Sequence, residues 1–272
     1  MIRHDRTHFD IIATLTCGQV FRFGKTASGV YEIISTSHRA TLYYEGDEVV
    51  IESDDDRYFY DYFDLSTDYG EIVGRLSTHP ILTDAVEYGK GIRILNQDKW
   101  ETLVSFIISA NNNIPRIKKT IERLCVDLGE DKGEYHAFPT VEALANASIE
   151  YLESVGLGYR AKYLHLTANA IKSGLYSLEV VDTLDTLSAN KYLCGLYGVG
   201  PKVADCILLF AYHRGDLFPV DTWIKSYYYT HYREGATSSE IRRHLVSIYG
   251  DLSGYAQQYI FYYDRRNISL LP

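Results

Sequence analysis

The stretch GLYGVGPKVADCILLFAYHRGDLFPVDTW, residues 195–223, decides between two folds for this chain. Its glycine-rich turn could be the phosphate loop of a doubly wound sheet or the connection between two helices. A dinucleotide loop needs its glycines directly after a strand. The preceding residues, TLSANKYLCGLY at 186–197, instead predict a helix, with Ser188 as a candidate N-cap. The stretch therefore predicts two helices joined by a glycine turn, and argues against a nucleotide cofactor.

Two charged residues in this stretch admit more than one interpretation. Lys202 falls in the first turn of the second helix, where the helix dipole disfavours a cation. Its simplest role is a solvent-facing lysine, but a partly desolvated amine there has its charged form disfavoured and could act as a nucleophile. Asp221 precedes another apolar helix and is an N-cap candidate. Such a carboxylate stays ionised and could also stabilise a cation that develops during a reaction.

The rest of the chain predicts an α+β fold, with an N-terminal antiparallel β-sheet domain packed on a mostly helical body. Alternating apolar and β-branched residues at 19–23, 30–35, 39–45 and 48–53 predict strands separated by glycine turns. From Arg57 onward the apolar residues recur at helical spacing. A run of strands followed by a run of helices is not the alternating order of a doubly wound sheet. We therefore expect a sheet domain over residues 1–95 and a helical domain over residues 96–272.

Composition places the chain among globular proteins of the cell interior. It has 272 residues, of which 46% are hydrophobic, enough for a sizeable core. No long apolar run and no signal sequence is evident, so we expect no membrane association and a location inside the cell, in the cytoplasm or nucleoid of a microbe or in a nucleus. Four widely spaced cysteines predict free thiols and no iron–sulfur cluster.

The net charge of −9 at first argues against a nucleic-acid partner, which needs a basic surface. Residues 1–100 hold 17 acidic and 10 basic side chains, however, while residues 101–272 hold 19 and 17. The acidity is thus mostly N-terminal, and we expect the run ESDDD at 52–56 to be a solvated loop. A local basic face on the second part remains open, and backbone amides at a helix N-terminus can bind a phosphate without one.

With a lysine and an aspartate on either side of its helix, the stretch resembles the helix-hairpin-helix motif of the base-excision DNA glycosylase superfamily (HhH-GPD). More segments are similar, in order, to its 8-oxoguanine DNA glycosylase/AP lyase branch. They are CGQVFRF (17–23), IRILNQDKWETLVSFIISANNNIPRIKKTIERLC (92–125), GLGYRAKY (156–163), LCGLYGVGPKVADCI (193–207), PVDTW (219–223) and YAQQYIF (255–261). Helix-hairpin-helix motifs alone are common, but this ordered set is specific.

The resemblance implies a bifunctional enzyme that flips 8-oxoguanine out of duplex DNA, excises it and nicks the strand by β-elimination. Lys202 would attack the sugar C1′ and form a Schiff base, while Asp221 would support the cationic sugar. The family's base pocket falls on Gly18, whose carbonyl would accept the N7 hydrogen, and on Cys206, Phe261 and Gln257. From their spacing alone, Cys206 and Phe261 would be core residues.

For DNA binding, the resemblance implies that Asn111 fills the gap left in the base stack and that Arg116, Tyr159 and Arg160 read the orphaned cytosine. On pattern alone, the Asn111 region is a helix C-cap and Arg116 part of a solvated basic face. The glycine turn, with Gly198 and Gly200, would grip the DNA backbone. The matching carbonyls for the family's monovalent cation, the one candidate cofactor and not a required one, belong to Cys194, Leu196 and Val199.

One departure concerns Trp223, which stands where well-known members have a histidine that contacts DNA phosphate. An indole has a single donor and cannot titrate, so that contact is in doubt. We expect a monomer whose partner is double-stranded DNA containing oxidised guanine. The alternatives are a glycosylase of the same superfamily for another damaged base, such as an alkylated purine, and a DNA-binding module without chemistry. Lys202 argues against the first, since monofunctional members lack that amine, and Lys202 and Asp221 together argue against the second.

Overall fold

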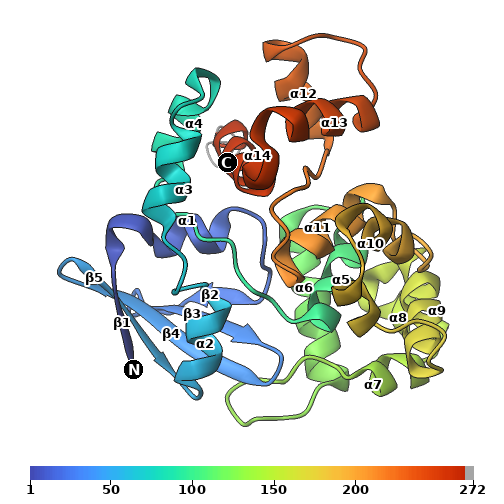
Figure 1. The fold of residues 1–272 in the computed structure, drawn as a ribbon. Coiled ribbons are helices and arrows are strands. Elements are labelled where there is room, and N and C mark those ends of the chain that lie inside the picture. The colour runs from blue at the N-terminus through green and yellow to red at the C-terminus, as the bar shows by residue number, and fades with distance from the viewer. Residues whose placement is uncertain (267–272) are drawn as a thin grey trace.

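A computed structural model of the chain describes residues 1–266 and confirms the α+β architecture (Figure 1). The N-terminal residues form an antiparallel sheet at the lower left of Figure 1, and the helices that follow form a body beside it. The last three helices return toward the N-terminal part and lie near α3 and α4. The order of elements, strands first and helices afterwards, is the one that the sequence pattern predicts.

The sheet contains five strands in the order β1-β5-β4-β3-β2, and every neighbouring pair is antiparallel. Alternation works as expected on β4, where Ala40 and Leu42 are buried between more exposed neighbours. The strand bounds are β1 Ile2–Asp5, β2 Phe23–Lys25, β3 Tyr31–Ser35, β4 His38–Glu45 and β5 Glu48–Ser53. The acidic run at 52–56 is not a free loop, because it ends β5 and supplies the N-cap of helix α2.

The predicted strand at 19–23 is wrong over most of its length, and β1 is a strand that the pattern did not reveal. Only Phe23 of that segment joins the sheet. The reason is that its polar side chains bond elsewhere. The Gln19 amide donates to the carbonyls of Thr14 and Arg93, at 2.9 and 2.7 Å, and the Arg22 guanidinium donates to the carbonyl of His136. Both side chains are buried, so they tie this segment to the rest of the molecule instead of exposing it as a strand.

Helices, joined by turns and loops, make up the remainder of the described chain, and the helical spacing predicted from Arg57 onward is confirmed. The N-terminal helices are α1 Ile11–Thr16, α2 Asp56–Tyr62, α3 Tyr69–Leu76 and α4 Thr83–Tyr88. The body consists of α5 Lys99–Ser109, α6 Ile114–Leu128, α7 Val141–Asn146, α8 Ile149–Leu152, α9 Arg160–Lys172, α10 Thr186–Leu193 and α11 Pro201–Ala211. The last three are α12 Thr222–His231, α13 Ser238–Tyr249 and α14 Ser253–Asp264.

Three apolar clusters hold these elements together. One fills the helical body between α5 and α11, and another lies between the sheet, α1 and α2. The third joins α1, α3 and α4 to α12, α13 and α14. The two ends of the chain therefore share a core. The domain boundary expected between residues 95 and 96 stays a prediction.

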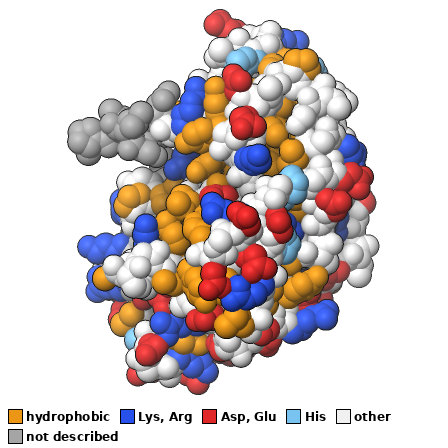
Figure 2. Space-filling view, turned by 90° about the vertical axis from the view of Figure 1, so that its left-hand side faces the viewer, with side chains coloured by type: hydrophobic (Ala, Val, Ile, Leu, Met, Phe, Trp, Pro, Cys, Tyr) orange, Lys and Arg blue, Asp and Glu red, His pale blue; other side chains and the backbone are white. Residues whose placement is uncertain are grey.

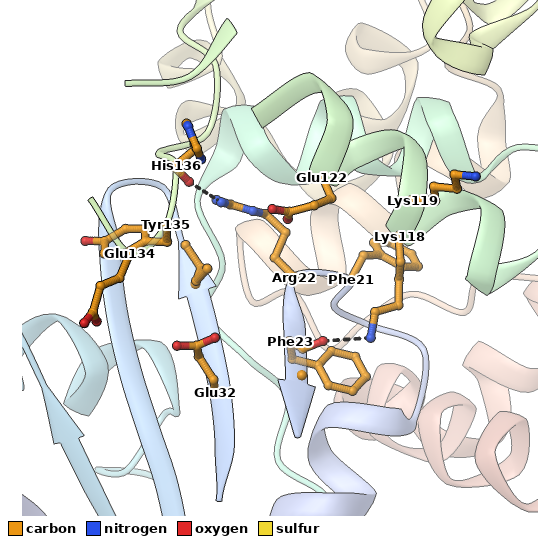
Figure 3. Close-up of a pocket in the computed structure, with 12 residues that line it drawn as sticks. Phe21, Arg22, Phe23, Glu32, Lys118, Lys119, Glu122, Glu134, Tyr135 and His136 are labelled. Atoms are coloured by element: carbon orange, nitrogen blue, oxygen red, sulfur yellow. Dashed lines mark hydrogen bonds between the residues drawn. The ribbon is translucent and has the colours of Figure 1, made fainter. Parts of the chain in front are cut away.

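The sheet meets the helical body where β2 lies against α6 (Figure 3). Lys118 on α6 donates to the carbonyl of Phe23 at 2.8 Å, and its ammonium lies 3.6 Å from the centre of the Phe23 ring. A cavity of about 440 Å³ opens beside this contact, and acidic and basic side chains line it together. None of the site residues predicted from the sequence lines this cavity. It is a feature of the junction between the sheet and the helical body.

Glu101 gives this junction a predictable dependence on pH. The side chain is buried on α5, accepts the Thr36 amide at 2.6 Å and lies 3.9 Å from Arg22. Burial raises the pKa of Glu101 to about 7, although Arg22 and the Thr36 amide lower it. Because the folded pKa lies above that of the unfolded chain, the stabilising contribution is present below about pH 4.5 and is lost as pH rises to 7.

We expect urea unfolding to show the wild-type protein losing roughly 3 kcal/mol between pH 4 and pH 8 through this group. The Glu101→Gln variant has no carboxyl to ionise there, and its stability should change less with pH over the same range. Parallel pH dependences for the two proteins would contradict the assignment.

One face of the molecule shows how the charged side chains are distributed. Acidic and basic side chains are intermingled on the face that corresponds to the left-hand side of Figure 1 (Figure 2). The N-terminal acidic excess therefore forms no single-sign surface on that face. None of the helices among residues 1–266 has the length and apolar character needed to cross a membrane.

Candidate active site

The helix pair predicted from residues 195–223 is present as α10 and α11, joined by a glycine turn. Asp185, not Ser188, is the N-cap of α10, because its carboxylate accepts the amides of Leu187 and Ser188 at 3.0 Å. In the turn, Gly198 has φ +81°, and a Cβ there would lie 2.9 to 3.1 Å from Tyr163 atoms. Only glycine fits this close approach.

Lys202 lies in the first turn of α11, as predicted, behind Pro201 at the first helical position. Its ammonium is 5.6 Å from the centre of the Phe106 ring. Burial lowers the pKa of Lys202, but the neighbouring Cys206 and the Asp221 carboxylate outweigh burial, so the pKa lies above its ordinary value. The expectation that the charged form is disfavoured is therefore wrong for the resting side chain. The amine has to lose a proton before it can act as a nucleophile.

Asp221 is the N-cap of α12, also as predicted, and accepts the Ile224 amide at 2.9 Å. The capping carboxylate also lies within electrostatic reach of Lys202, whose pKa it raises. Asp221 therefore has two functions that do not compete. It satisfies an orphan donor of α12, and it places a fixed negative charge beside the amine.

A polar cluster anchors the loop that connects Lys202 to Asp221. His213 in this loop lies 2.9 Å from Oδ1 of Asn96 through Nδ1, and its Nε2 lies 3.2 Å from the Tyr255 hydroxyl. The same nitrogen is 3.3 Å from the buried Asp64 carboxylate. Burial raises the pKa of Asp64, but His213 and the neighbouring hydroxyl groups lower it by more. The pKa of Asp64 therefore lies below its ordinary value. These contacts tie the loop to the N-terminal part and to α14.

A second cluster fixes α11 against its neighbours. Asp205, buried next to Cys206, accepts Nε of Arg242 at 2.7 Å and Nδ2 of Asn190 at 2.7 Å. Arg242 lies on α13 and Asn190 on α10, so one carboxylate holds three helices at the hairpin. The role of Asp205 was not predicted from the sequence. Its only signal was an aspartate inside an otherwise apolar helix.

Of the predicted base-pocket residues, Gly18 and Phe261 lie against each other, where the segment after α1 meets α14. Cys206 is buried on α11, and burial raises the pKa of its thiol to about 11, so it is a neutral thiol near neutral pH. All four cysteines are free, as predicted. Gly18 has φ +89°, and a Cβ there would lie 2.8 Å from Cε1 of Phe261. A side chain at Gly18 is thus excluded by both its backbone and its neighbour.

Two glutamines set the position of Gly18. Gln258 on α14 donates to the carbonyl of Cys17 at 2.7 Å, and Gln19 donates to the carbonyl of Thr14 and accepts the amide of Leu95. The peptide group before Gly18 is therefore held from α14. Neither role was predicted from the sequence, although Gln19 lies inside the motif CGQVFRF and Gln258 inside YAQQYIF.

Gln257 carries a signal of its own. Its side chain is only 5% exposed, yet its Oε1 has no hydrogen-bond partner among the residues that the structure describes. Buried polar atoms are nearly always paired, so this oxygen, one helical turn before Phe261 on α14, is available to a ligand.

The residues predicted to contact the opposite strand lie where α5, α6 and α9 meet. Asn111 is exposed, with φ +51°, between α5 and α6. Arg116 is exposed and donates to the carbonyl of Gly156 at 3.2 Å. Tyr159 is 54% exposed, whereas Arg160 is buried. The Arg160 guanidinium donates to the carbonyls of Ala110, at 2.9 Å, and of Asn111, at 2.7 Å, so here it fixes the backbone that presents Asn111.

The remaining predicted residues belong to the hairpin and to the start of α12. Trp223 is 36% exposed in the first turn of α12, and Gly200 is the N-cap of α11. Of the three predicted cation ligands, Leu196 accepts the Val199 amide at 3.2 Å. The carbonyls of Cys194 and Val199 accept no hydrogen bond within residues 1–266. Free carbonyls are the donors that a hard cation prefers, so the turn fits such an ion.

Comparisons with known proteins give the same picture along nearly the whole chain. Residues 1–103 match the model of the 8-oxoguanine DNA glycosylase N-terminal domain, and residues 104–249 match that of the HhH-GPD superfamily of base excision DNA repair proteins. The chain is 32% identical to the N-glycosylase/DNA lyase OGG1 of Arabidopsis thaliana, over 94% of this chain and 78% of that one.

A probable N-glycosylase/DNA lyase of Methanothermobacter thermautotrophicus is also 32% identical, over 68% of this chain and 67% of the other. Among solved structures, the 8-oxoguanine glycosylase/lyase of Clostridium acetobutylicum is similar with a TM-score of 0.92 and 41% identity, covering 96% of this chain and 93% of that chain. That structure is a complex with double-stranded DNA containing cytosine opposite 8-oxoguanine.

Proposed function

This chain belongs to the 8-oxoguanine DNA glycosylase family within the HhH-GPD superfamily, and we propose from that membership that it is a bifunctional DNA glycosylase and AP lyase. Its substrate is 8-oxoguanine in double-stranded DNA. It acts where the cell keeps its DNA. The observation that carries the proposal is the placement of Lys202 and Asp221 at the starts of two successive helices, with the aspartate close enough to affect the lysine pKa.

Lys202 supplies the nucleophile in this proposal. Once its ammonium has lost a proton, the amine nitrogen attacks the sugar C1′, and the damaged base leaves with the electron pair of the glycosidic bond. The nitrogen loses a proton, and its lone pair then forms the C=N bond of a Schiff base as the C1′–O4′ bond breaks and O4′ takes up a proton. Loss of a proton at C2′ of this ring-opened sugar expels the 3′ phosphate by β-elimination. Asp221 stabilises the positive charge that develops on the sugar, because its carboxylate is fixed by the α12 cap.

Gly18, Cys206, Gln257 and Phe261 form the base pocket. The Gly18 carbonyl accepts the N7 hydrogen, which 8-oxoguanine carries and guanine lacks. Guanine in the same place would put two acceptors against each other, a mismatch that costs roughly 1–3 kcal/mol. The unpaired Oε1 of the buried Gln257 supports a role in reading the pairing edge of the base.

The hairpin and the α5–α6 turn bind the DNA itself. The exposed Asn111 fills the gap in the stack, and Arg116, Tyr159 and Arg160 lie around the orphaned cytosine. Gly198 and Gly200 bring backbone amides to a phosphate. The carbonyls of Cys194, Leu196 and Val199 would hold a monovalent cation, whose charge would attract that phosphate. Trp223 offers an indole donor beside Asp221.

Opposite-base preference tests this proposal. We expect excision of 8-oxoguanine to be faster opposite cytosine than opposite adenine by about tenfold or more, because a bidentate contact discriminates bases by 1–3 kcal/mol. The measurement is single-turnover release of the base from two duplexes that differ only at that position. Equal rates would contradict the role of Arg116, Tyr159 and Arg160, and release of an alkylated purine in preference to 8-oxoguanine would contradict the substrate.

Gln258 gives a second prediction, because it positions Gly18 without touching the base. Replacing Gln258 with Leu removes the donor to the Cys17 carbonyl and leaves that acceptor unpaired. We expect the ratio of 8-oxoguanine to guanine excision to fall by roughly tenfold. Nicking of a preformed abasic site needs no base pocket and should change much less. If both activities fall together, the variant has lost its fold and not its discrimination.

A further inference from the structure

Arg265, directly after α14, lies at the base pocket without an assigned role. Its guanidinium carbon is 4.8 Å from the centre of the Phe261 ring. Its Nη1 lies 3.0 Å from the position that a Cβ on Gly18 would take. Within residues 1–266 the guanidinium makes no hydrogen bond and no ion pair. A half-buried arginine with that little polar contact is unusual, since its five donors normally find acceptors.

The electrostatic surroundings of Arg265 include the active site. Burial lowers the pKa of Arg265, while the Asp221 carboxylate and Cys17 raise it. The guanidinium therefore interacts electrostatically with the Asp221 carboxylate, although the two groups form no ion pair. A permanent cation in that position opposes any positive charge that Asp221 is meant to stabilise.

The adjacent arginine provides the contrast. Arg266 also stacks on an aromatic ring, with its guanidinium carbon 3.5 Å from the centre of Tyr263. It donates to the Tyr263 carbonyl at 2.7 Å as well. Arg266 therefore has the partners expected of a basic residue at a helix C-terminus. Arg265, one residue earlier, forgoes such a carbonyl and lies on Phe261.

We propose that Arg265 is the gate of the base pocket: its guanidinium occupies, on Phe261 and beside Gly18, the place that a flipped base takes. The inference rests on the proposed function, in which those two residues hold the base. A planar guanidinium stacks on a ring much as a base does, so the pocket wall stays covered until a base displaces it. The released guanidinium then moves to the DNA backbone, where a phosphate supplies the acceptors it lacks.

The gate has two consequences for the reaction. A base must replace the cation–π contact with its own stacking and hydrogen bonds, so a base that makes fewer contacts is returned to the duplex more often. Guanine, without the N7 hydrogen, is such a base. In addition, departure of the guanidinium removes a cation from the vicinity of Asp221 when the sugar becomes cationic. Base entry and electrostatic preparation of the site are then one event.

Binding of the free 8-oxoguanine base, without DNA, tests the gate most simply. The Arg265→Ala protein should bind the base about fivefold more tightly than the wild type, because no guanidinium has to be displaced. Arg265→Met, which keeps an apolar stem of similar length, should show the same direction of change. Arg266→Ala removes an equal charge one residue away and should bind the base like the wild type. Isothermal titration with the four proteins gives the comparison.

A DNA measurement separates the gate from a loss of pocket structure. For duplexes containing 8-oxoguanine, the logarithm of the binding constant falls as the logarithm of salt concentration rises. The Arg265→Ala variant should make this negative slope shallower by about one, since one phosphate contact is lost. Free-base affinity equal to or weaker than that of the wild type in both Arg265 variants would overturn the gate. If the wild-type protein excises no 8-oxoguanine from duplex DNA, the proposed function fails and the gate fails with it.

Discussion

The Lys202→Gln protein is expected to lose base excision and strand nicking together, each by roughly 10³-fold or more, because one amine serves as nucleophile in both steps. Glutamine is one atom shorter than lysine and stays polar, but its amide nitrogen has no lone pair available for attack. The ammonium that the substitution removes lies near the Phe106 ring and Cys206. Glutamine leaves no buried charge at this place, so the fold should be retained. Single-turnover kinetics with a labelled 8-oxoguanine duplex and with an abasic duplex measure the two activities separately.

Lys172→Gln is a suitable control for this prediction. Lys172 ends α9 and donates to the Asn146 side chain at 2.7 Å on an exposed part of the surface. The substitution makes the same chemical change away from the site, and both activities should stay at the wild-type level. Retention of excision by Lys202→Gln with loss of nicking alone would mean that water, not the lysine, displaces the base.

Asp221→Asn is expected to reduce the rate of base excision by about 10²–10³-fold, the usual loss when a fixed electrostatic partner of the transition state is removed. Asparagine is as good an N-cap as aspartate, so α12 keeps its first hydrogen bond to the Ile224 amide. Stability should change by less than ~1 kcal/mol, from the loss of a charge at a helix N-terminus. Urea unfolding and single-turnover excision together distinguish charge from structure.

The pH dependence of the same variant is a sharper readout. Since the Asp221 carboxylate raises the pKa of Lys202, its removal should shift the rising limb of the pH–rate profile toward lower pH. Asp185→Asn, the same change at the N-cap of α10, should leave the profile where it is. A fall in rate without any shift of the limb would show that Asp221 does not act on the lysine.

Much of this account could be predicted from the sequence because the relevant patterns are local. Helical spacing, the glycine turn and the cap before α12 place Lys202 and Asp221 without any knowledge of the packing. The strand predicted at 19–23 was wrong because the deciding contacts there are not local. Its alternation is typical of a strand, but Gln19 and Arg22 bond to residues that are distant in the chain.

Gln258 and Asp205 could not be predicted from the sequence because their roles depend on such long-range contacts. Gln258 and Cys17 are 241 residues apart, and Asp205 meets Arg242 across 37 residues. The predicted direction of the Lys202 pKa shift was wrong. A helix N-terminus and burial both lower this pKa, and they can be inferred from the sequence, whereas the fold brings Cys206 and Asp221, which raise it, next to the amine. Arg265 gives no signal in the sequence beyond a basic residue after an apolar helix.

The most direct test of the central claim, that Lys202 attacks the sugar carbon, is reduction with borohydride during reaction with an 8-oxoguanine duplex. Borohydride converts a Schiff base into a stable amine, so the wild-type protein should become covalently attached to the DNA. Peptide mapping of the adduct should place the attachment on Lys202. We expect an adduct with the wild-type and Lys172→Gln proteins and none with Lys202→Gln. An adduct of undiminished yield with Lys202→Gln, or none with the wild type, would contradict it.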